Sequence, residues 1–321
     1  MEEGFALWAN PSSPHAEGRR ARSALENARE RAKAALGWDG ELIFTSGASE
    51  AAALALGKAK AGERLVSAVE HDCILQAAPE AKRLSVTSDG ALNGDQLAQA
   101  VQSEHPLVAV QHVNSETGNR QDLAAVAEVV KGAGGLLLAD CAQSAGKFSL
   151  PPCDMAIVSA HKFGGPIGVG ALLVADYAML EPTGGHERGY RRGTENLPGA
   201  MGMAAALEAA GEPFLDPFVA APLNELSGAL ELSDPTPYIR AIAMPNLSAT
   251  AQVMRFDMTG IAVSQGSACS SGTMKTSRVL EAMGVEPDIA ANTIRVSVGW
   301  NTTREEVERF CEAWIDMAKR A

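Results

Sequence analysis

The sequence predicts an α/β protein, with a mostly parallel β-sheet covered by helices on both faces and a smaller α+β part at the C-terminus. Short, continuously apolar segments alternate with helical segments through the first two thirds of the chain, a pattern typical of buried parallel strands joined by helices. Prolines then recur from Pro213 to Pro237, and a final strand and helix follow over residues 293–319. We therefore expect a large domain over residues 1–205 and a small domain over residues 206–321.

Each expected element rests on a local pattern. Residues 19–36 are charged and amphipathic and end at Gly37, which predicts a helix. Leu42–Thr45 predicts a strand, and the small residues Ser46–Ser49 lead into an alanine-rich helix over residues 50–56. Further apolar runs predict strands at residues 65–69, 107–112, 136–139, 155–159 and 169–174, and helical patterns cover residues 121–131 and 200–210.

Composition argues against several classes of function. The chain has 321 residues, 46% of them hydrophobic and 21% charged, with a formal net charge of −12. The sequence has no basic block, which argues against nucleic acid or a membrane as a partner. It also has no apolar run near the roughly 20 residues that span a bilayer. The acidic start Met1-Glu2-Glu3 is unlike a signal peptide. Five scattered cysteines without a Cys-x-x-Cys pair favour reduced thiols in the cytoplasm and no structural zinc.

The most informative segment is the end of the expected strand 155–159, which is followed by His161 and Lys162. The glycine-rich run Gly164–Gly170 comes next and leaves space around the lysine. An amine presented at the carboxyl end of a buried strand is suited to a Schiff base with pyridoxal phosphate (PLP). Taken alone, the segment is better explained by a surface lysine at a strand end, so the case for PLP depends on the rest of the chain.

Two earlier strand ends carry residues that suit the same cofactor. Gly47, Ala48 and Ser49 open a helix, so their N–H groups and the positive end of the helix dipole can hold a phosphate. The alternative is an ordinary capped helix start. His71 follows strand 65–69 and can stack on a flat heteroaromatic ring, although a lone histidine is more often an ordinary hydrogen-bonded residue. The spacing His71-x-Cys73 has no further ligands at suitable positions, so we expect no metal site.

A carboxylate follows the expected strand 136–139. Asp140 emerges from an apolar run, where an unpaired charge is costly. The protonated pyridine nitrogen of PLP is a suitable partner, because it must stay positive when the ring acts as an electron sink. Gln143 lies further along and can donate to the ring hydroxyl, while the alternative for Asp140 is a helix N-cap. In chain order, the phosphate turn, His71, Asp140 and Lys162 together predict a PLP-dependent enzyme of fold type I, the aspartate-aminotransferase-like fold.

Longer motifs then resemble one family. The chain is similar to cysteine desulfurases of the class V aminotransferase type in the segments Glu70-His71, His112–Gly118, Asp140–Gln143, Ser159–Lys162, Gly184–Asn196 and Gly266-Ser267-Ala268-Cys269-Ser270-Ser271-Gly272. The resemblance runs from about Asn10 to the C-terminus. The sequence of the segment around Cys269 resembles that of the branch of the family that serves general iron–sulfur assembly.

The resemblance implies roles for particular residues. Cys269, on a loop of small residues, is the nucleophile that attacks the substrate sulfur. Lys162 forms the Schiff base, and either Lys162 or a neighbouring residue removes the α-proton. The resemblance thus implies three catalytic residues, which are Lys162, Cys269 and His71. Arg295 binds the substrate carboxylate, a task that suits the two-pronged guanidinium, and Ser115 lies beside the substrate.

The same matching implies the remaining contacts and the reaction. Ser159 and His161 bind the cofactor phosphate, and Thr194 reaches the phosphate of a partner subunit, which implies a homodimer. L-cysteine is converted to L-alanine, and its sulfur becomes a persulfide on Cys269 for an acceptor protein of iron–sulfur cluster assembly. Two alternatives stay open: another class V PLP enzyme, such as a selenocysteine lyase or an aminotransferase, and a weakly active desulfurase scaffold that depends on a partner.

The chain departs from the family at three places. Family members normally begin with a segment of the type Tyr-Leu-Asp-x-x-Ala-Thr-Thr-Pro beside the active site, and this sequence starts beyond it; either the gene start is late or the arm is absent. Ser115 stands where the family has a second asparagine, so that contact is lost or water-mediated. The stretch from Gly211 to Tyr238 is shorter than its family equivalent. We expect these departures to affect catalytic rate and stand-alone activity more than fold or cofactor.

Overall fold

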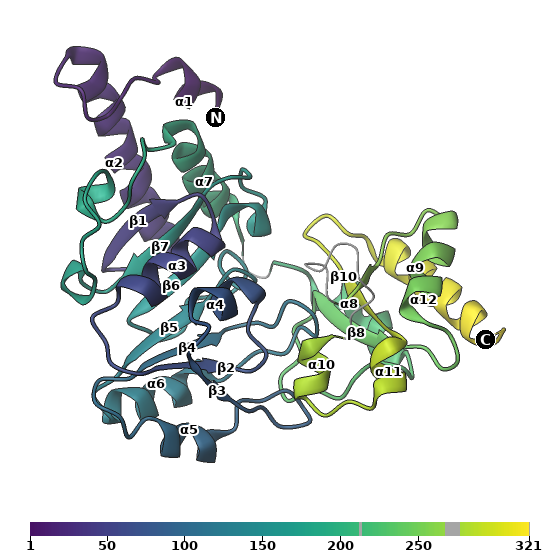
Figure 1. The fold of residues 1–321 in the computed structure, drawn as a ribbon. Helices are drawn as coiled ribbons and strands as arrows, with labels where there is room; N and C mark the ends of the chain where they lie inside the picture. Colours follow the sequence, from purple (N-terminus) through teal and green to yellow (C-terminus); the bar gives the residue numbers. More distant parts are fainter. Residues whose placement is uncertain (212–213, 267–276, 321) are drawn as a thin grey trace.

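The computed structural model describes residues 1–211, 214–266 and 277–320. Within this part of the chain, two β-sheets organise the fold (Figure 1). The seven-stranded sheet and the helices on it are called the large unit below, and the three-stranded sheet and its helices the small unit. Helix α7 continues past residue 205, and the expected division between residues 205 and 206 stays a prediction.

The large unit contains the strands that the sequence predicts, with one addition. Its strands are β1 (Glu41–Thr45), β2 (Arg64–Ser67), β3 (Lys82–Leu84), β4 (Leu107–Gln111), β5 (Leu136–Asp140), β6 (Met155–Ser159) and β7 (Gly170–Val174), in the spatial order β1-β7-β6-β5-β4-β2-β3. Only β7 runs antiparallel to its neighbours, so the expected mostly parallel sheet is confirmed. The sequence does not predict strand β3, because two of its three residues are exposed and charged and form no apolar run.

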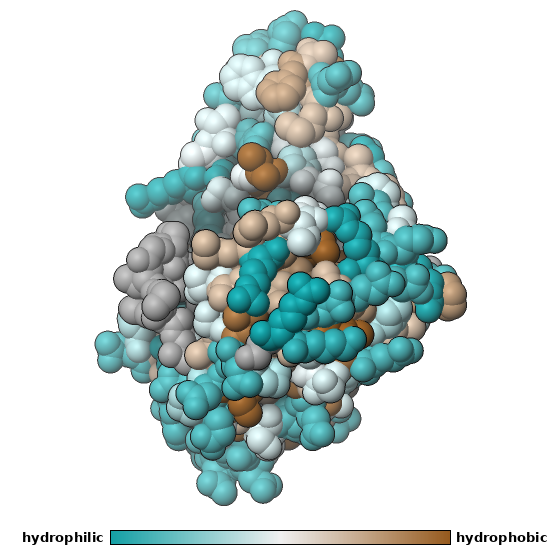
Figure 2. Space-filling model, turned by 90° about the vertical axis from the view of Figure 1, so that its right-hand side faces the viewer, coloured by the Kyte–Doolittle hydropathy of each residue, from teal (hydrophilic) through white to brown (hydrophobic). Residues whose placement is uncertain are grey.

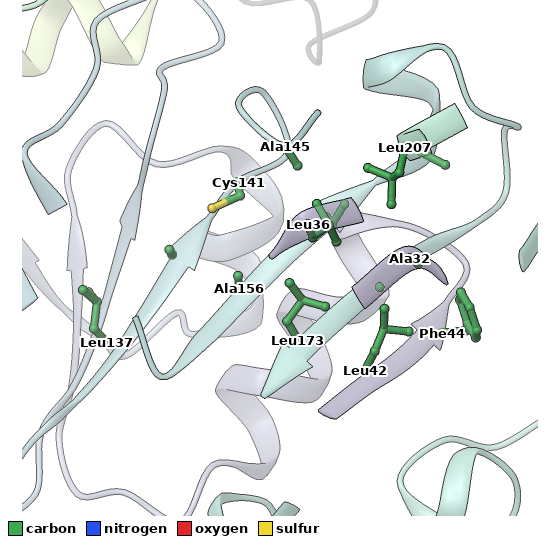
Figure 3. Packing of buried hydrophobic residues seen from close by; sticks show 14 of the residues in the cluster. Ala32, Leu36, Leu42, Phe44, Leu137, Cys141, Ala145, Ala156, Leu173 and Leu207 are labelled. Carbon is green, nitrogen blue, oxygen red and sulfur yellow. The ribbon is translucent and has the colours of Figure 1, made fainter. Parts of the chain in front are cut away.

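Helices cover both faces of this sheet. They are α1 (Glu2–Ala6), α2 (Ala16–Leu36), α3 (Ala48–Lys58), α4 (Asp72–Ala77), α5 (Gly94–Ala100), α6 (Leu123–Gly132) and α7 (Leu197–Ala209). Leu42 and Phe44 of β1 pack on the face with α2, α5, α6 and α7, whereas Ile43 packs on the face with α3 and α4. Figure 3 shows part of the first core, where Leu36 of α2 and Leu207 of α7 lie over strand residues. Burial on both faces is why the strands are continuously apolar in sequence.

The small unit follows the large one in the chain and lies beside it (Figure 1). Its antiparallel sheet has the order β8-β10-β9, and its elements are α8 (Pro217–Ala220), β8 (Ile239–Ala243), α9 (Ala249–Met258), β9 (Ser264–Gln265), α10 (Arg278–Ala282), α11 (Pro287–Ala291), β10 (Thr293–Ser297) and α12 (Arg304–Ala318). The expected final strand and helix are β10 and α12. Phe256, Phe310 and Trp314 form part of a separate core. Helices α10 and α11 have five residues each, too few for periodicity to reveal them.

The face turned to the viewer in Figure 2 is mostly hydrophilic, with narrow hydrophobic strips between polar side chains. Among the described residues, none of the helices has both the length and the apolar character needed to cross a membrane.

Candidate active site

A cavity of about 730 Å³ lies where the two units meet, beyond the carboxyl ends of the parallel strands. This size is within the range of small-molecule sites. Its lining brings together the predicted site residues Gly47, Ala48, Ser49, His71, Ser115, Asp140, Gln143, Ser159, His161, Lys162 and Arg295. Residues from five strand ends and from the small unit therefore meet in one place. Four of these strand ends are those at which the sequence predicts a cofactor site, and Ser115 and Arg295 are the residues that the family resemblance adds.

The turn after β1 is shaped to receive an anion. It directs the N-terminus of α3, an 11-residue helix, at the cavity. Gly47 has a φ of 150°, a conformation that favours glycine, and no described atom lies within 4 Å of the place a Cβ would take. Gly170 at the start of β7 allows the turn to approach, because a Cβ on Gly170 would lie 2.8 Å from the Gly47 Cα. The glycine run after Lys162 thus makes space partly for the phosphate turn.

Asp140 is the last residue of β5 and is buried. Its Oδ1 accepts the Ala142 N–H at 2.9 Å, and within the described part of the chain Oδ2 accepts no hydrogen bond. Burial raises the pKa of Asp140, while the nearby His71 and Lys162 charges lower it. A turn rather than a helix follows, so the helix N-cap alternative is wrong. The open carboxylate oxygen suits a protonated ring nitrogen.

The segment after β6 presents three polar side chains to the cavity. A short 3-10 helix, Ala160–Phe163, carries His161 and Lys162. The Ser159 Oγ lies 3.0 Å from the His161 Nδ1. Burial, with the Lys162 charge adding to it, lowers the pKa of His161, which keeps its imidazole neutral near pH 7. A hydroxyl and a neutral imidazole beside the α3 N-terminus are suitable donors to a phosphate.

His71 is the N-cap of α4, and its ring is held locally. Its Nδ1 accepts the Cys73 N–H at 3.2 Å and lies 3.1 Å from the Cys73 Sγ. Cys73 also lines the cavity. Burial raises the pKa of the Cys73 thiol to about 12, with the Asp140 and Glu70 charges adding to the shift, so it stays protonated. The described residues hold no cluster of three or more His, Cys, Asp or Glu side chains suited to a metal ion.

The opposite wall of the cavity comes from the small unit. Arg295 of β10 donates from Nη1 to the Ser115 carbonyl at 3.2 Å. Ser277, the N-cap of α10, donates to the Glu116 Oε2 at 2.6 Å. These contacts place a guanidinium across the cavity from the strand ends, where it can bind a carboxylate.

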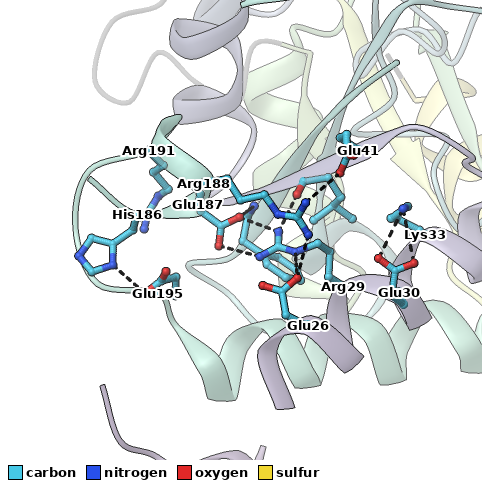
Figure 4. Close-up of polar contacts among 12 residues, drawn as sticks. Glu26, Arg29, Glu30, Lys33, Glu41, His186, Glu187, Arg188, Arg191 and Glu195 are labelled. Atoms are coloured by element: carbon cyan, nitrogen blue, oxygen red, sulfur yellow. Dashed lines mark hydrogen bonds and ion pairs between the residues drawn. The ribbon is translucent and has the colours of Figure 1, made fainter. Parts of the chain in front are cut away.

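Two predicted site residues are not in the described lining of this cavity. Cys269 lies outside the described residues. Thr194 is exposed, at the end of a loop that ion pairs tie to the rest of the large unit (Figure 4). In that loop, Glu187 binds the buried Arg29, and Arg191 lies 2.9 Å from Glu50.

The structure also adds residues to which the sequence analysis gave no role. Glu70, Gln111, Glu116 and Arg278 line the cavity. Glu70 and Glu116 lie inside motifs that carry the family resemblance, and that was the available signal for them. Arg278 had no local signal, because its partner Asp72 is 206 residues away in the chain.

The described residues fit PLP. The N-terminus of α3 with Ser159 and His161 matches a phosphate, and the Asp140 carboxylate matches a ring nitrogen that carries a proton. Lys162 supplies the amine that the aldehyde requires. The same cavity has Arg295 at its other wall, so it can hold an amino acid against the cofactor.

Comparison with known proteins identifies the family of the chain. A family profile described as aminotransferase class V matches residues 5–215, and the chain belongs to this family of PLP-dependent enzymes with fold type I. An X-ray structure of a NifS-like protein from Rickettsia africae ESF-5 has a TM-score of 0.88 at 27% identity, covering 100% of this chain and 95% of that chain.

Within the family, the chain is one of the cysteine desulfurases. It is 37% identical over 348 residues to a cysteine desulfurase of Frankia sp. (strain EuIK1), which covers 94% of this chain and 82% of the relative. It is 35% identical over 337 residues to a cysteine desulfurase of Cereibacter sphaeroides, with coverage of 95% and 87%. The predicted fold class, cofactor and enzyme class are confirmed.

Proposed function

We propose that the protein converts L-cysteine to L-alanine and passes the sulfur, carried on Cys269, to an acceptor protein of iron–sulfur cluster assembly. The observation that supports this most is that Lys162, Asp140 and Arg295 line one cavity. An amine, a buried carboxylate and a guanidinium are what a PLP enzyme needs to act on the α-carbon of an amino acid. Related proteins named cysteine desulfurase narrow the substrate to cysteine.

The large unit would hold the cofactor. When bound, PLP supplies an electron sink for negative charge that develops on the substrate. Asp140 would keep a proton on the ring nitrogen, and His71 would stack on the ring and limit its tilt. Gln143 would donate to the ring hydroxyl. The α3 N-terminus, together with Ser159 and His161, would bind the phosphate.

The residues that face the substrate would do the remaining work. Arg295 would fix the substrate carboxylate, and Lys162 Nζ would take the α-proton and return it. Cys269 would attack the substrate sulfur: the Sγ–S bond forms while the substrate C–S bond breaks. The electron pair goes to carbon, which takes a proton and completes alanine. One thiol and one cysteine thus become one persulfide and one alanine, with no external oxidant.

The test is alanine production from L-cysteine by the purified PLP-loaded protein, alone and with candidate acceptor proteins. We expect Cys269→Ser to keep the visible absorption of bound PLP and to lose sulfide and persulfide formation. Cys153→Ser is the matched control, because Cys153 lies outside the described cavity lining and should leave activity unchanged. Full activity of Cys269→Ser, or faster amino-group transfer to a keto acid than desulfuration, would contradict the proposal.

We also infer that two copies form a dimer in which Thr194 contributes to the phosphate site of the other copy. Thr194 is exposed, and Ile167, which lines the cavity, has 84% of its surface exposed. A second copy that covers this edge of the cavity would remove the Ile167 side chain from water. Light scattering of the holoenzyme should give twice the 33.4 kDa mass of the chain. A fully active monomer would rule out this arrangement.

The free thiols of the described cysteines fit a reducing compartment, and we propose that the enzyme works in the cytoplasm. Cell fractionation tests this, and recovery of the protein outside the cytoplasmic fraction would contradict it.

A further inference from the structure

Arg278, the first residue of α10, reaches from the small unit to the segment that carries His71. Its Nη1 donates to the Asp72 Oδ1 at 2.6 Å, and its Nη2 donates to the Glu70 carbonyl at 2.9 Å. The two acceptors therefore stand on either side of His71 in the chain. We infer that Arg278 is a positioning residue, which fixes His71 from the small unit in the place where it meets the cofactor. This inference rests on the proposed stacking role of His71.

The His71 segment is held in the large unit by packing, since Ile74 of α4 is fully buried in a cluster with residues of α3, and the Arg278 fork adds contacts to the two residues that flank His71. Helix α4, which His71 caps, has six residues, and a helix this short has few internal hydrogen bonds. The ring is held by contacts with Cys73, which belongs to the same short helix. These local bonds orient the ring relative to α4, the burial of Ile74 places α4 on α3, and the Arg278 fork fixes the start of α4. The guanidinium fork fixes two points, one before and one after His71.

Apolar packing supports the same connection between the units. Val69, two residues before His71, is buried in a cluster with Val279, Leu280 and Met283, which lie in α10 or directly after it. The Ser277 hydroxyl ties the start of α10 to Glu116 at 2.6 Å. Because α10 is fixed against the large unit on both sides of Arg278, the guanidinium has a defined position from which to hold residues 70–72.

The expected effect of Arg278 is on geometry rather than on stability. The side chains of Arg278 and Asp72 are 47% and 40% exposed, and such ion pairs contribute little to the free energy of unfolding. The bond to the Glu70 carbonyl is partly buried and directional. Loss of the fork should therefore leave the protein folded and let the imidazole move, and misplacement by about 1 Å can lower a rate by about two orders of magnitude.

The chain offers a matched control. Arg120 and Asp234 also join the large unit to the small unit, with the same 2.6 Å separation and similar exposure. Neither residue belongs to the described lining of the cavity. Arg120→Ala thus removes an ion pair between the units without touching the His71 segment, and it reports what a purely structural contact does.

The experiment compares holoenzymes of Arg278→Ala, Arg278→Lys, Arg120→Ala, His71→Ala and the double variant Arg278→Ala/His71→Ala. The readouts are the visible circular dichroism of bound PLP, which reports how the ring is held, and kcat and KM for L-cysteine. We expect Arg278→Ala to change the dichroism band and lower kcat about tenfold, Arg278→Lys to do so less, and Arg120→Ala to do neither. In the His71→Ala background, loss of Arg278 should have no further effect.

Two results would overturn the inference while leaving the proposed function intact. One is a wild-type dichroism band in Arg278→Ala when His71→Ala changes that band. The other is a fully additive loss in the double variant, which would mean that Arg278 acts independently of His71. If His71→Ala leaves both band and activity unchanged, the proposed role of His71 fails and the inference fails with it. If Arg278→Ala does not retain PLP, the dichroism band and the kcat of Arg278→Lys are compared with those of His71→Ala in its place.

Discussion

Two arginine–carboxylate pairs with the same 2.6 Å separation stand in opposite surroundings. Arg29 and Glu187, in the large unit, have side chains only 2% and 1% exposed (Figure 4). Arg120 and Asp234, at the junction of the two units, are 39% and 48% exposed. The charges of the first pair are shielded from water, so removal of either partner leaves a buried charge without compensation. The charges of the second pair are solvated whether or not they touch, so their contact adds little to the free energy of unfolding.

The buried pair is part of a network that fixes a loop. Arg29 Nη1 also donates to the Leu42 carbonyl at 2.6 Å, and Glu187 Oε2 accepts the Phe44 N–H at 3.0 Å. Glu187 and Arg188 have positive φ values of 49° and 56°, an unfavourable conformation that the surrounding contacts must hold. Burial by itself lowers the pKa of Arg29, and the bonds and charge of Glu187 outweigh it and raise the pKa.

The difference indicates how the molecule divides its tasks. The wall of the cavity that would hold the cofactor belongs to a unit with buried, mutually dependent contacts. The wall that would hold the substrate is joined to the large unit by exposed ion pairs and by two buried apolar clusters, one around Val69 and one around Val113 and Tyr238. We therefore expect the exposed ion pairs between the units to open more readily than the buried pair inside the large unit.

The largest expected effect is that of Glu187→Ala. This change leaves the Arg29 guanidinium buried without its main counter-charge, and breaking a buried pair in this way costs about 3–5 kcal/mol of unfolding free energy. Arg120→Ala should cost only about 0.2–1 kcal/mol. Urea unfolding of the holoenzymes at one PLP concentration measures both. Similar losses in the two variants would mean that burial does not separate these pairs.

The parts of the molecule that were predicted from sequence are those with local signals. Gly47, Asp140 and Lys162 each follow an apolar run at a strand end, so their common edge could be inferred before the sheet was seen. The antiparallel direction of β7 has no such signal, since an apolar strand is the same in both directions. The pairs Arg29–Glu187 and Arg278–Asp72 join residues 158 and 206 positions apart, and only the folded chain defines them.

Glu70 extends the comparison to a buried carboxylate that, among the described residues, forms no ion pair with an arginine, although the Arg278 guanidinium binds its main-chain carbonyl. Its side chain is fully buried, Oε1 accepts the Gln111 N–H at 2.8 Å, and within the described residues Oε2 has no hydrogen-bond partner. Burial raises the pKa of Glu70 well above its ordinary value, and the Asp140 charge adds to the shift. Between the ordinary value near 4.5 and the raised value, the folded state binds more protons than the unfolded state. Stability should therefore fall as pH rises through that window.

Glu70→Gln tests this at a smaller scale than Glu187→Ala. Glutamine keeps an acceptor for the Gln111 N–H and has no charge, so above the window the variant should be more stable than the wild type, whose buried carboxylate is charged there. At the acidic end of the pH series, Glu70 is protonated in both the folded and the unfolded wild type, so the difference in stability between wild type and variant should vanish. Urea unfolding over a series of pH values measures this difference in stability.

Glu116→Gln is the comparator. Burial also raises the pKa of Glu116, but its carboxylate accepts a hydrogen bond from Ser277, so the gain in stability of Glu116→Gln should be smaller. A Glu70→Gln variant that is less stable at every pH would mean that the ionised carboxylate has compensating interactions, and buried carboxylates in the large unit would then not need an arginine partner.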